Sequence, residues 1–168
     1  MITRPHTSEF PEFQQKYIAL VPDDVQSYLH EQKTRFLNYI DDLKTEQLDH
    51  RYAEGKWSIR EAIMHIIDTE QVFSYRTLAV SRGDSQNLSG FDQDVYIAGF
   101  DSSHLNQAYL SRFFSTTRDA FMLLSEGMQE SDWNKVGKMS NYDMILSAMP
   151  YMIAGHLEHH LNILKERY

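Results

Sequence analysis

Two histidines near the end of the chain have the spacing of a metal site. In the segment GHLEHH, residues 155–160, His156 and His160 are four residues apart. On a helix, four steps of about 100° place the second side chain within about 40° of the first, one turn further along the same face. Two imidazoles placed in this way can bind one divalent ion, although two surface or core histidines would have the same spacing. His159 is rotated away from both, which favours an outer contact or a bystander.

Hydrophobic neighbours indicate that this pair faces the interior. Met152, Ile153, Ile163 and Leu164 place an apolar stripe beside the two rings. A polar group that is buried without a partner is costly, so inward histidines need partners. A further candidate is His65, which lies among isoleucines and a methionine in another helical segment. Taken alone, His65 would be interpreted as a core histidine with a satisfied hydrogen bond.

Carboxylates near His65 strengthen the metal interpretation. Glu61 and Asp68 lie on its face of the helix, and a carboxylate beside a ligand imidazole commonly fixes the ring's tautomer. An ion pair of Asp68 with Arg60 or Arg76 is the alternative. Glu158 lies outside this pattern and is expected to face solvent.

Three histidines from two facing helices would leave open positions on the ion, which is typical of a catalytic site. Such an ion could lower the pKa of a water or a thiol, or polarise a carbonyl group. Imidazole ligands suit zinc, nickel, copper and iron, so the sequence does not select the metal. It contains no HExxH motif, and it identifies no general base beside the histidines, so the catalytic and cofactor-binding residues stay unassigned.

Apolar residues at helical spacing predict four long helices, at about 22–44, 58–81, 103–127 and 141–168. Ser58 and Glu61 form a capping box at the start of the second helix. Ser103 is the expected N-cap of the third helix, and Asn141 that of the fourth. Pro150 then falls inside the fourth helix, where it should kink or divide it.

The remaining segments are a strap over residues 1–21, anchored by Phe10, Phe13 and Tyr17, and a long loop over residues 84–101. Phe91 and Tyr96 in that loop could cover the histidine site or simply keep the loop ordered. No strand pairs are evident, so the sequence predicts an all-α four-helix bundle with a long loop between its second and third helices. Its 168 residues fit a single domain.

Composition excludes several classes of protein. The net charge of −8 argues against nucleic-acid binding, because that affinity depends on neutralising phosphates. The chain has no cysteine, which excludes disulfides, cysteine-ligated zinc, iron–sulfur clusters and a thiol nucleophile of its own. Neither a signal peptide nor a membrane-spanning stretch is evident, so we expect a cytoplasmic protein without membrane contact.

Three sequence runs carry a resemblance to a known family. They are YAEGKWSIREAIMHIIDTEQVFSYR (52–76), RGDSQNLSGFDQDVY (82–96) and IAGHLEHHLNILKERY (153–168). Together they resemble the DinB-like superfamily of metal-binding four-helix bundles, which includes bacillithiol S-transferases, and the likeness spans essentially the whole chain. It implies that His65, His156 and His160 hold a divalent metal ion, most often nickel or zinc. It also implies a homodimer and thiol-dependent transfer or isomerisation, although many members have no assigned reaction.

These observations predict a metal-dependent enzyme with a three-histidine site that transfers a low-molecular-weight thiol to a small electrophilic substrate. The alternatives are a metal-dependent hydrolase and a non-catalytic metal-binding module of a stress response. Two further residues have open roles. Trp57 is expected to act as a hydrophobic staple rather than to stack on a substrate. Arg76 could hold an anionic substrate or pair with Glu70 or Asp92, and a structural role is favoured.

Overall fold

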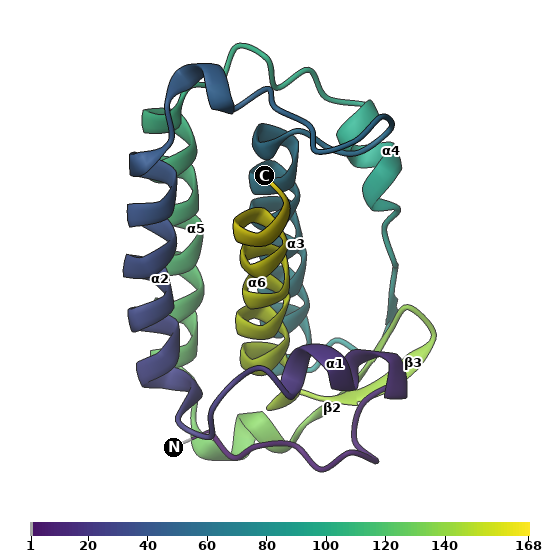
Figure 1. The fold of residues 1–168 in the computed structure, drawn as a ribbon. Helices are drawn as coiled ribbons and strands as arrows, with labels where there is room; N and C mark the ends of the chain where they lie inside the picture. The colour runs from purple at the N-terminus through teal and green to yellow at the C-terminus, as the bar shows by residue number, and fades with distance from the viewer. Residues whose placement is uncertain (1) are drawn as a thin grey trace.

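Four long helices form the body of the protein in the computed structural model, which describes residues 2–168 (Figure 1). They are α2 (Val25–Asp42), α3 (Ile59–Ser81), α5 (Gln107–Glu126) and α6 (Ala148–Arg167). Both α2 and α3 pack against α5 and α6, so each helix has two neighbours in the bundle. The predicted four-helix bundle is therefore confirmed. None of the helices in residues 2–168 is long and apolar enough to cross a membrane.

Local hydrogen bonds explain where α3 and α5 begin. At α3 the predicted capping box is present, since Ser58 N donates to Glu61 Oε2 at 2.7 Å and Glu61 N donates to Ser58 Oγ at 3.2 Å. The prediction for α5 was three residues early. Ser103 N donates to Asp101 in a turn, and Asn106 is the N-cap, accepting from Tyr109 N at 2.9 Å.

The first part of the predicted fourth helix is a β-hairpin, so that prediction was wrong. Strands β2 (Val136–Met139) and β3 (Tyr142–Ile145) pair in an antiparallel manner. Between them, Ser140 and Asn141 have φ values of 53° and 70°. Two successive residues of positive φ make the tight turn that matches strand twist, and Asn tolerates this conformation well. Asn141 is thus a turn residue rather than a helix cap.

A second correction concerns Pro150, which neither kinks nor divides α6. The helix begins at Ala148, so Pro150 lies in its first turn. Backbone N–H groups in the first turn have no partner within the helix, and a proline there removes nothing.

The segment predicted as a long loop contains regular structure. Strand β1 (Asn87–Leu88) adds to β2 in a parallel manner, giving a three-stranded sheet in the order β1-β2-β3. Helix α4 (Gln93–Ala98) follows, and its N-cap Asp92 accepts hydrogen bonds from the backbone of Asp94 and Val95. The expectation of no strand pairs was therefore wrong, because these strands are too short to show an alternating pattern.

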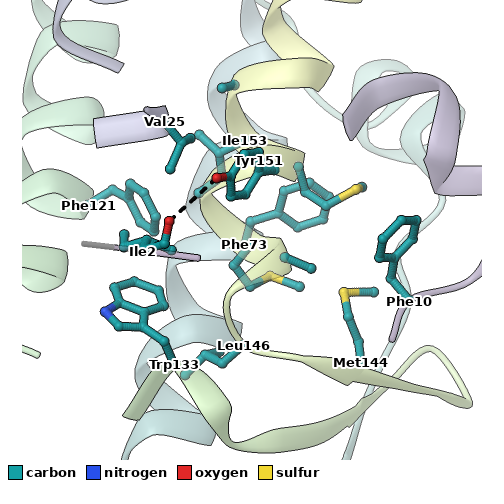
Figure 2. Close-up of a cluster of buried hydrophobic side chains, with 14 of the residues drawn as sticks. Ile2, Phe10, Val25, Phe73, Phe121, Trp133, Met144, Leu146, Tyr151 and Ile153 are labelled. Carbon is teal, nitrogen blue, oxygen red and sulfur yellow. Dashed lines mark hydrogen bonds between the residues drawn. The ribbon is translucent and has the colours of Figure 1, made fainter. Parts of the chain in front are cut away.

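The strap before α2 contains a 3-10 turn (Glu12–Gln14) and α1 (Gln15–Ile18). Further 3-10 turns lie at Thr45–Gln47 and Glu130–Asn134. Of the three predicted anchors, Phe10 is buried, Tyr17 is half-buried and Phe13 is 55% exposed. Figure 2 shows how Ile2 and Phe10 of the strap join Tyr151 of α6 in one buried cluster. The Tyr151 hydroxyl donates to the carbonyl of Asp23 at 2.7 Å, which ties the strap to the bundle.

A glycine lets the strap cross α6 at close range. A Cβ atom added at Gly155 would overlap the backbone carbonyl of Tyr17 and lie 3.0 Å from its Cα atom. Backbone atoms cannot rotate away, so a larger residue must push the strap outward. His156 is the next residue, and its ring lies 5.7 Å from that of Tyr17. The glycine therefore sets the distance between the strap and the histidines.

We expect Gly155→Ala to lower the free energy of unfolding by about 1–3 kcal/mol, which is the usual cost of overpacking. Urea unfolding followed by circular dichroism measures it. Gly127→Ala is the matched control, because a Cβ there meets only two carbonyl oxygens at 3.6 Å. That variant should stay within about 0.5 kcal/mol of the wild type. Equal stability of the two variants would contradict the role given to Gly155.

Candidate metal centre

The three predicted histidines meet between α3 and α6. Nε2 of His65 lies 3.0 Å from Nε2 of His156. One ring nitrogen from each of His65, His156 and His160 falls within 4.8 Å of the others. The centroids of the three rings are 4.5 to 4.8 Å apart. The structure thus brings together the residues that sequence spacing selected, although two of them lie about ninety residues from the third.

Aromatic side chains from other segments pack around these rings. Trp57, just before α3, has its ring centroid 4.7 Å from that of His65 and 6.3 Å from that of His160. Tyr17 of the strap lies 5.7 Å from His156 on the same measure. The sequence had suggested only a staple role for Trp57. These contacts restrict the rotation of the imidazoles and exclude water from two sides.

Burial keeps the imidazoles neutral at ordinary pH. Desolvation lowers the pKa of His65 to about 4. It lowers the pKa of His160 to about 3, with a smaller contribution from the nearby histidines. For the fully buried His156, desolvation and then the neighbouring histidines hold the pKa well below its ordinary value. A neutral imidazole has a free lone pair, which is the form that binds a metal ion.

This donor set fits a divalent ion. Three neutral nitrogens that face one another leave lone pairs without donors, because at most one hydrogen bond can form between two of the rings. A shared cation satisfies all three at once, and three protein ligands leave positions open for a substrate. Among the histidine and acidic side chains of residues 2–168, these three form a cluster close enough to share an ion. The three-histidine cluster therefore indicates a divalent metal, and the assignment of the individual ligands stays a prediction.

The neighbours predicted for His65 differ in the structure. Thr69 Oγ1 lies 3.5 Å from His65 Nδ1, in the position expected for a carboxylate. Asp68 is partly buried, and this burial raises the pKa of its carboxyl group. Within the described part of the chain Asp68 forms neither of the predicted ion pairs, because Arg60 binds Asp49 and Arg76 binds neutral oxygens.

Glu158 faces α2 rather than solvent, so the sequence prediction was wrong. Its side chain is 13% exposed and accepts hydrogen bonds from Tyr28 at 2.8 Å, Gln32 at 3.0 Å and Arg35 at 2.7 Å. Burial raises the pKa of Glu158, but these hydrogen bonds and the charge of Arg35 outweigh it and leave the pKa below its ordinary value. The contacts fix the rotation of α6, which aims the histidines on either side of Glu158 at α3.

A buried ion pair ties the remaining helices into this arrangement. Arg118 of α5 is fully buried, and its Nε and Nη2 donate to the carboxylate of Glu70 on α3 at 2.5 and 2.9 Å. Its Nη1 donates to Leu29 O and to Gln32 Oε1 on α2 at 3.2 and 3.3 Å. Gln32 in turn donates to Ala154 O on α6 at 2.8 Å. One continuous set of polar contacts therefore links all four helices.

Two cavities reach the histidines. The larger has a volume of about 690 Å³ and is lined by His65, His156 and residues of the strap, the hairpin and the segment before α4. The smaller has a volume of about 340 Å³ and is lined by His160, Trp57 and the last turn of α6. Asp94 of α4 lines both of them. Sequence reasoning did not find this position, because nothing in the pattern of the loop predicts where it folds.

Other candidates from the sequence lie at the edges of the site. His159 is half-buried, 5.1 Å from the His160 ring and 5.3 Å from the Tyr17 ring, and is not one of the three clustered histidines. Phe91 lines the larger cavity and packs on Tyr96 at 5.1 Å, so it both covers the cavity and orders the loop. Arg76 lines the same cavity and pairs with neither Glu70 nor Asp92.

Comparisons with known proteins agree with this fold. A candidate metal-dependent hydrolase of Oceanobacillus iheyensis is 23% identical over 153 residues, which cover 85% of this chain and 84% of the relative. YfiT from Bacillus subtilis, described as a probable metal-dependent hydrolase with an unusual four-helix bundle topology, superposes with a TM-score of 0.76 at 16% identity. That match covers 96% of this chain and 89% of YfiT.

A mycothiol-dependent maleylpyruvate isomerase has the same fold, with a TM-score of 0.69 at 13% identity. The match covers 86% of this chain and 61% of the isomerase. These structural likenesses establish the fold. The sequence model of the DinB superfamily matches residues 28–164. This range includes all of α3 and α5, most of α2 and α6, and the three clustered histidines. The chain belongs to the DinB superfamily.

Proposed function

We propose that the protein is a metal-dependent enzyme that transfers a low-molecular-weight thiol to an electrophilic substrate. One observation carries this proposal: three neutral imidazoles converge, and two cavities reach them. His65, His156 and His160 would hold the ion, and the family resemblance favours nickel or zinc among the metals that imidazole ligands suit. When bound, a divalent ion supplies Lewis-acid activation of a thiol or a water molecule.

The two cavities favour a reaction with two organic substrates. The cavity of about 690 Å³ reaches His65 and His156, and the cavity of about 340 Å³ reaches His160. One can receive the thiol while the other receives the electrophile, so that both can reach the histidines. Because the chain has no cysteine, the attacking sulfur must come from a small molecule.

Asp94 is the candidate proton acceptor of this reaction. Among the residues lining the two cavities it is the carboxylate common to both. It lies in the first turn of α4, and its side chain is exposed, so the carboxylate is accessible to a substrate proton. A base placed between the two substrates can take the thiol proton as the sulfur attacks.

Hydrolysis is the second candidate function. The descriptions of the Oceanobacillus relative and of YfiT as metal-dependent hydrolases favour it. In that reaction Asp94 would accept the proton of a water molecule, and one cavity would hold the whole substrate. The same histidines serve both reactions, so experiments must separate them.

Removal of any one clustered histidine should abolish stoichiometric metal binding. We expect His65→Ala, His156→Ala and His160→Ala each to lose the ion, because two imidazoles hold it far less tightly than three. Elemental analysis of untagged protein measures this, and chelator should lower the melting temperature of the wild type but not of the variants. His104→Ala, at an exposed histidine in the loop before α5, is the control and should keep the metal. Unchanged metal content in the three variants would refute the site.

The choice between thiol transfer and hydrolysis is settled by turnover assays. We expect metal-loaded protein to accelerate conjugation of chlorodinitrobenzene with a thiol from a panel of glutathione, cysteine and coenzyme A. Chelator should remove that activity, because the activated sulfur depends on the ion. Metal-dependent hydrolysis of nitrophenyl acetate without any thiol would instead support the hydrolase. Bound metal with neither activity would support a non-catalytic binding module.

Substitution of Asp94 tests its role as the base. Asp94→Asn keeps the shape of the side chain and removes its basicity, so kcat should fall about 10²-fold or more while metal content stays unchanged. The fall should be smaller at high pH, where more of the thiol is already ionised. Asp143→Asn removes the same charge from an exposed position on β3 and should leave kcat unchanged. Equal kcat values for the two variants would assign the proton to another acceptor.

A further inference from the structure

Arg76 is buried beside the larger cavity without an anionic partner. Its side chain is 5% exposed, and its Nη2 donates to Ser89 O at 2.7 Å and to Ser140 Oγ at 3.0 Å. Its Nε atom is buried and has no hydrogen-bond partner within residues 2–168. Seven ion pairs are present in that part of the chain, and none includes Arg76. The guanidinium lies over the Phe73 ring, with its Cζ atom 5.7 Å from the ring centroid, but no carboxylate of residues 2–168 pairs with its charge.

A second unpartnered atom lies at the same cavity. Among the described residues two buried side-chain polar atoms lack a partner, Nε of Arg76 and Oε1 of Gln14. Both residues line the larger cavity, one from α3 and the other from the strap. Native proteins pair nearly all such atoms, and the exceptions need an explanation. Arg76 requires an acceptor, whereas Gln14 Oε1 requires a donor. The place of Arg76 at this cavity, next to three convergent histidines, indicates that a ligand supplies the acceptor.

The acidic residues of the cavity do not serve as this partner. Asp92 lines the cavity, but its Oδ1 caps α4 by accepting from two backbone N–H groups. Asp94 also lines it and forms no ion pair with Arg76. The chain carries a net charge of −8, which repels anions in general. An anion that enters this cavity therefore depends on the local charge of Arg76.

The position of Arg76 relative to the histidines sets the length of the ligand. Arg76 follows His65 by eleven residues on α3. Eleven helical steps are three turns plus about 20°, so both side chains leave the same face, with Cα atoms about 16 Å apart. The single cavity that touches both has a volume of about 690 Å³. It can hold an elongated molecule whose two ends reach the two residues.

We propose that Arg76 binds the carboxylate of an elongated acidic thiol whose sulfur lies at the three histidines. This deepens the proposed function and rests on it for the identity of the reacting end. The carboxylate accepts a charge-assisted hydrogen bond from a guanidinium N–H group that Ser89 and Ser140 do not occupy. Ser89 and Ser140 hold Arg76 through Nη2 alone, which orients the group and leaves its other nitrogens for the ligand.

A purely structural role explains only part of this arrangement. Through Nη2, Arg76 ties the segment before α4 to the turn of the β2–β3 hairpin. A neutral glutamine could make such a tie to neutral oxygens without burying an unpaired charge. Burial also lowers the pKa of Arg76, as expected of a charge without a counter-ion. The structural role and the ligand role predict different responses to an added acid.

Calorimetric titration of zinc-loaded protein with matched thiols tests the proposal. The probe is ω-mercaptooctanoate, and its neutral match is ω-mercaptooctanol. We expect the acid to bind at least about tenfold more tightly than the alcohol, because the charge-assisted hydrogen bonds exist only with the acid. The short pair, mercaptopropionate and mercaptopropanol, cannot span the cavity and should show no such advantage. Equal binding of the long acid and the long alcohol would overturn the proposal.

Variants assign the effect to Arg76. Arg76→Met should abolish the advantage of the long acid, whereas Arg112→Gln, which removes an exposed positive charge from α5, should keep it. An advantage that survives in Arg76→Met would also overturn the proposal. If Arg76→Met does not fold, the Nε–H resonance of Arg76 in the wild type replaces it, assigned by its absence in Arg76→Lys. That resonance should shift with the acid and not with the alcohol, and a resonance that does not move refutes the site.

A further arm separates this inference from the proposed function. In metal-free protein, octanoate should still shift the Arg76 resonance, because the anion site does not require the ion. A shift without thiol transfer in the loaded enzyme would preserve the anion site and reject the reaction. Thiol transfer without any acid advantage would preserve the reaction and reject the anion site.

Discussion

A buried arginine of α5 fixes the positions of α2 and of α3, which carries His65. Arg118 has no exposed surface, and its three nitrogens contact Glu70 on α3 and Leu29 and Gln32 on α2. Removing one partner of such a pair typically costs about 3–5 kcal/mol, since the other charge is left buried and uncompensated. A slip of one helix by a residue would break several of these contacts together. The polar network therefore selects one register of the bundle, in which His65 faces α6.

The same network reaches the metal centre through α6. Gln32 bridges Arg118 to Ala154 O and to Glu158, and these residues flank His156 in the sequence. On an adjacent face of α6 the Tyr17 backbone lies close to Gly155. Helix α6 is thus held from two sides just where its histidines point inward. This explains how three desolvated imidazoles, which gain little from one another, can remain aimed at a common point.

The sequence predicted the histidine site because its signals are local and periodic. Ser58 and Glu61 cap a helix whose period carries His65 inward, and His156 and His160 repeat at one turn. The predictions from the sequence failed where a tertiary contact overrides the local pattern. The local pattern predicts that Glu158 is solvated, but in the fold it accepts hydrogen bonds from Tyr28, Gln32 and Arg35 of α2.

The hairpin and the cavity could not be derived from the sequence for a related reason. Asn141 fits a helix cap as well as a tight turn, and only the pairing of β2 with β3 decides between them. The position of Pro150 in α6 follows from that same choice. Arg76 acquires its environment from Ser89 and Ser140, which are distant in the sequence and belong to irregular segments. The spacing of residues in the sequence carries no information on such tertiary contacts.

The two parts of the site are therefore built on different kinds of structure. The three histidines lie on α3 and α6, whose alignment is fixed by buried charge and cannot drift without loss of the fold. The walls of the larger cavity come from the strap, the segment before α4 and the hairpin turn, where substitutions cost less stability. Relatives with 13–23% identity can thus keep the bundle while their cavity walls diverge. On this view the helices determine which atoms can be activated, and residues such as Gln14, Arg76 and Asp94 determine which molecule is brought to them.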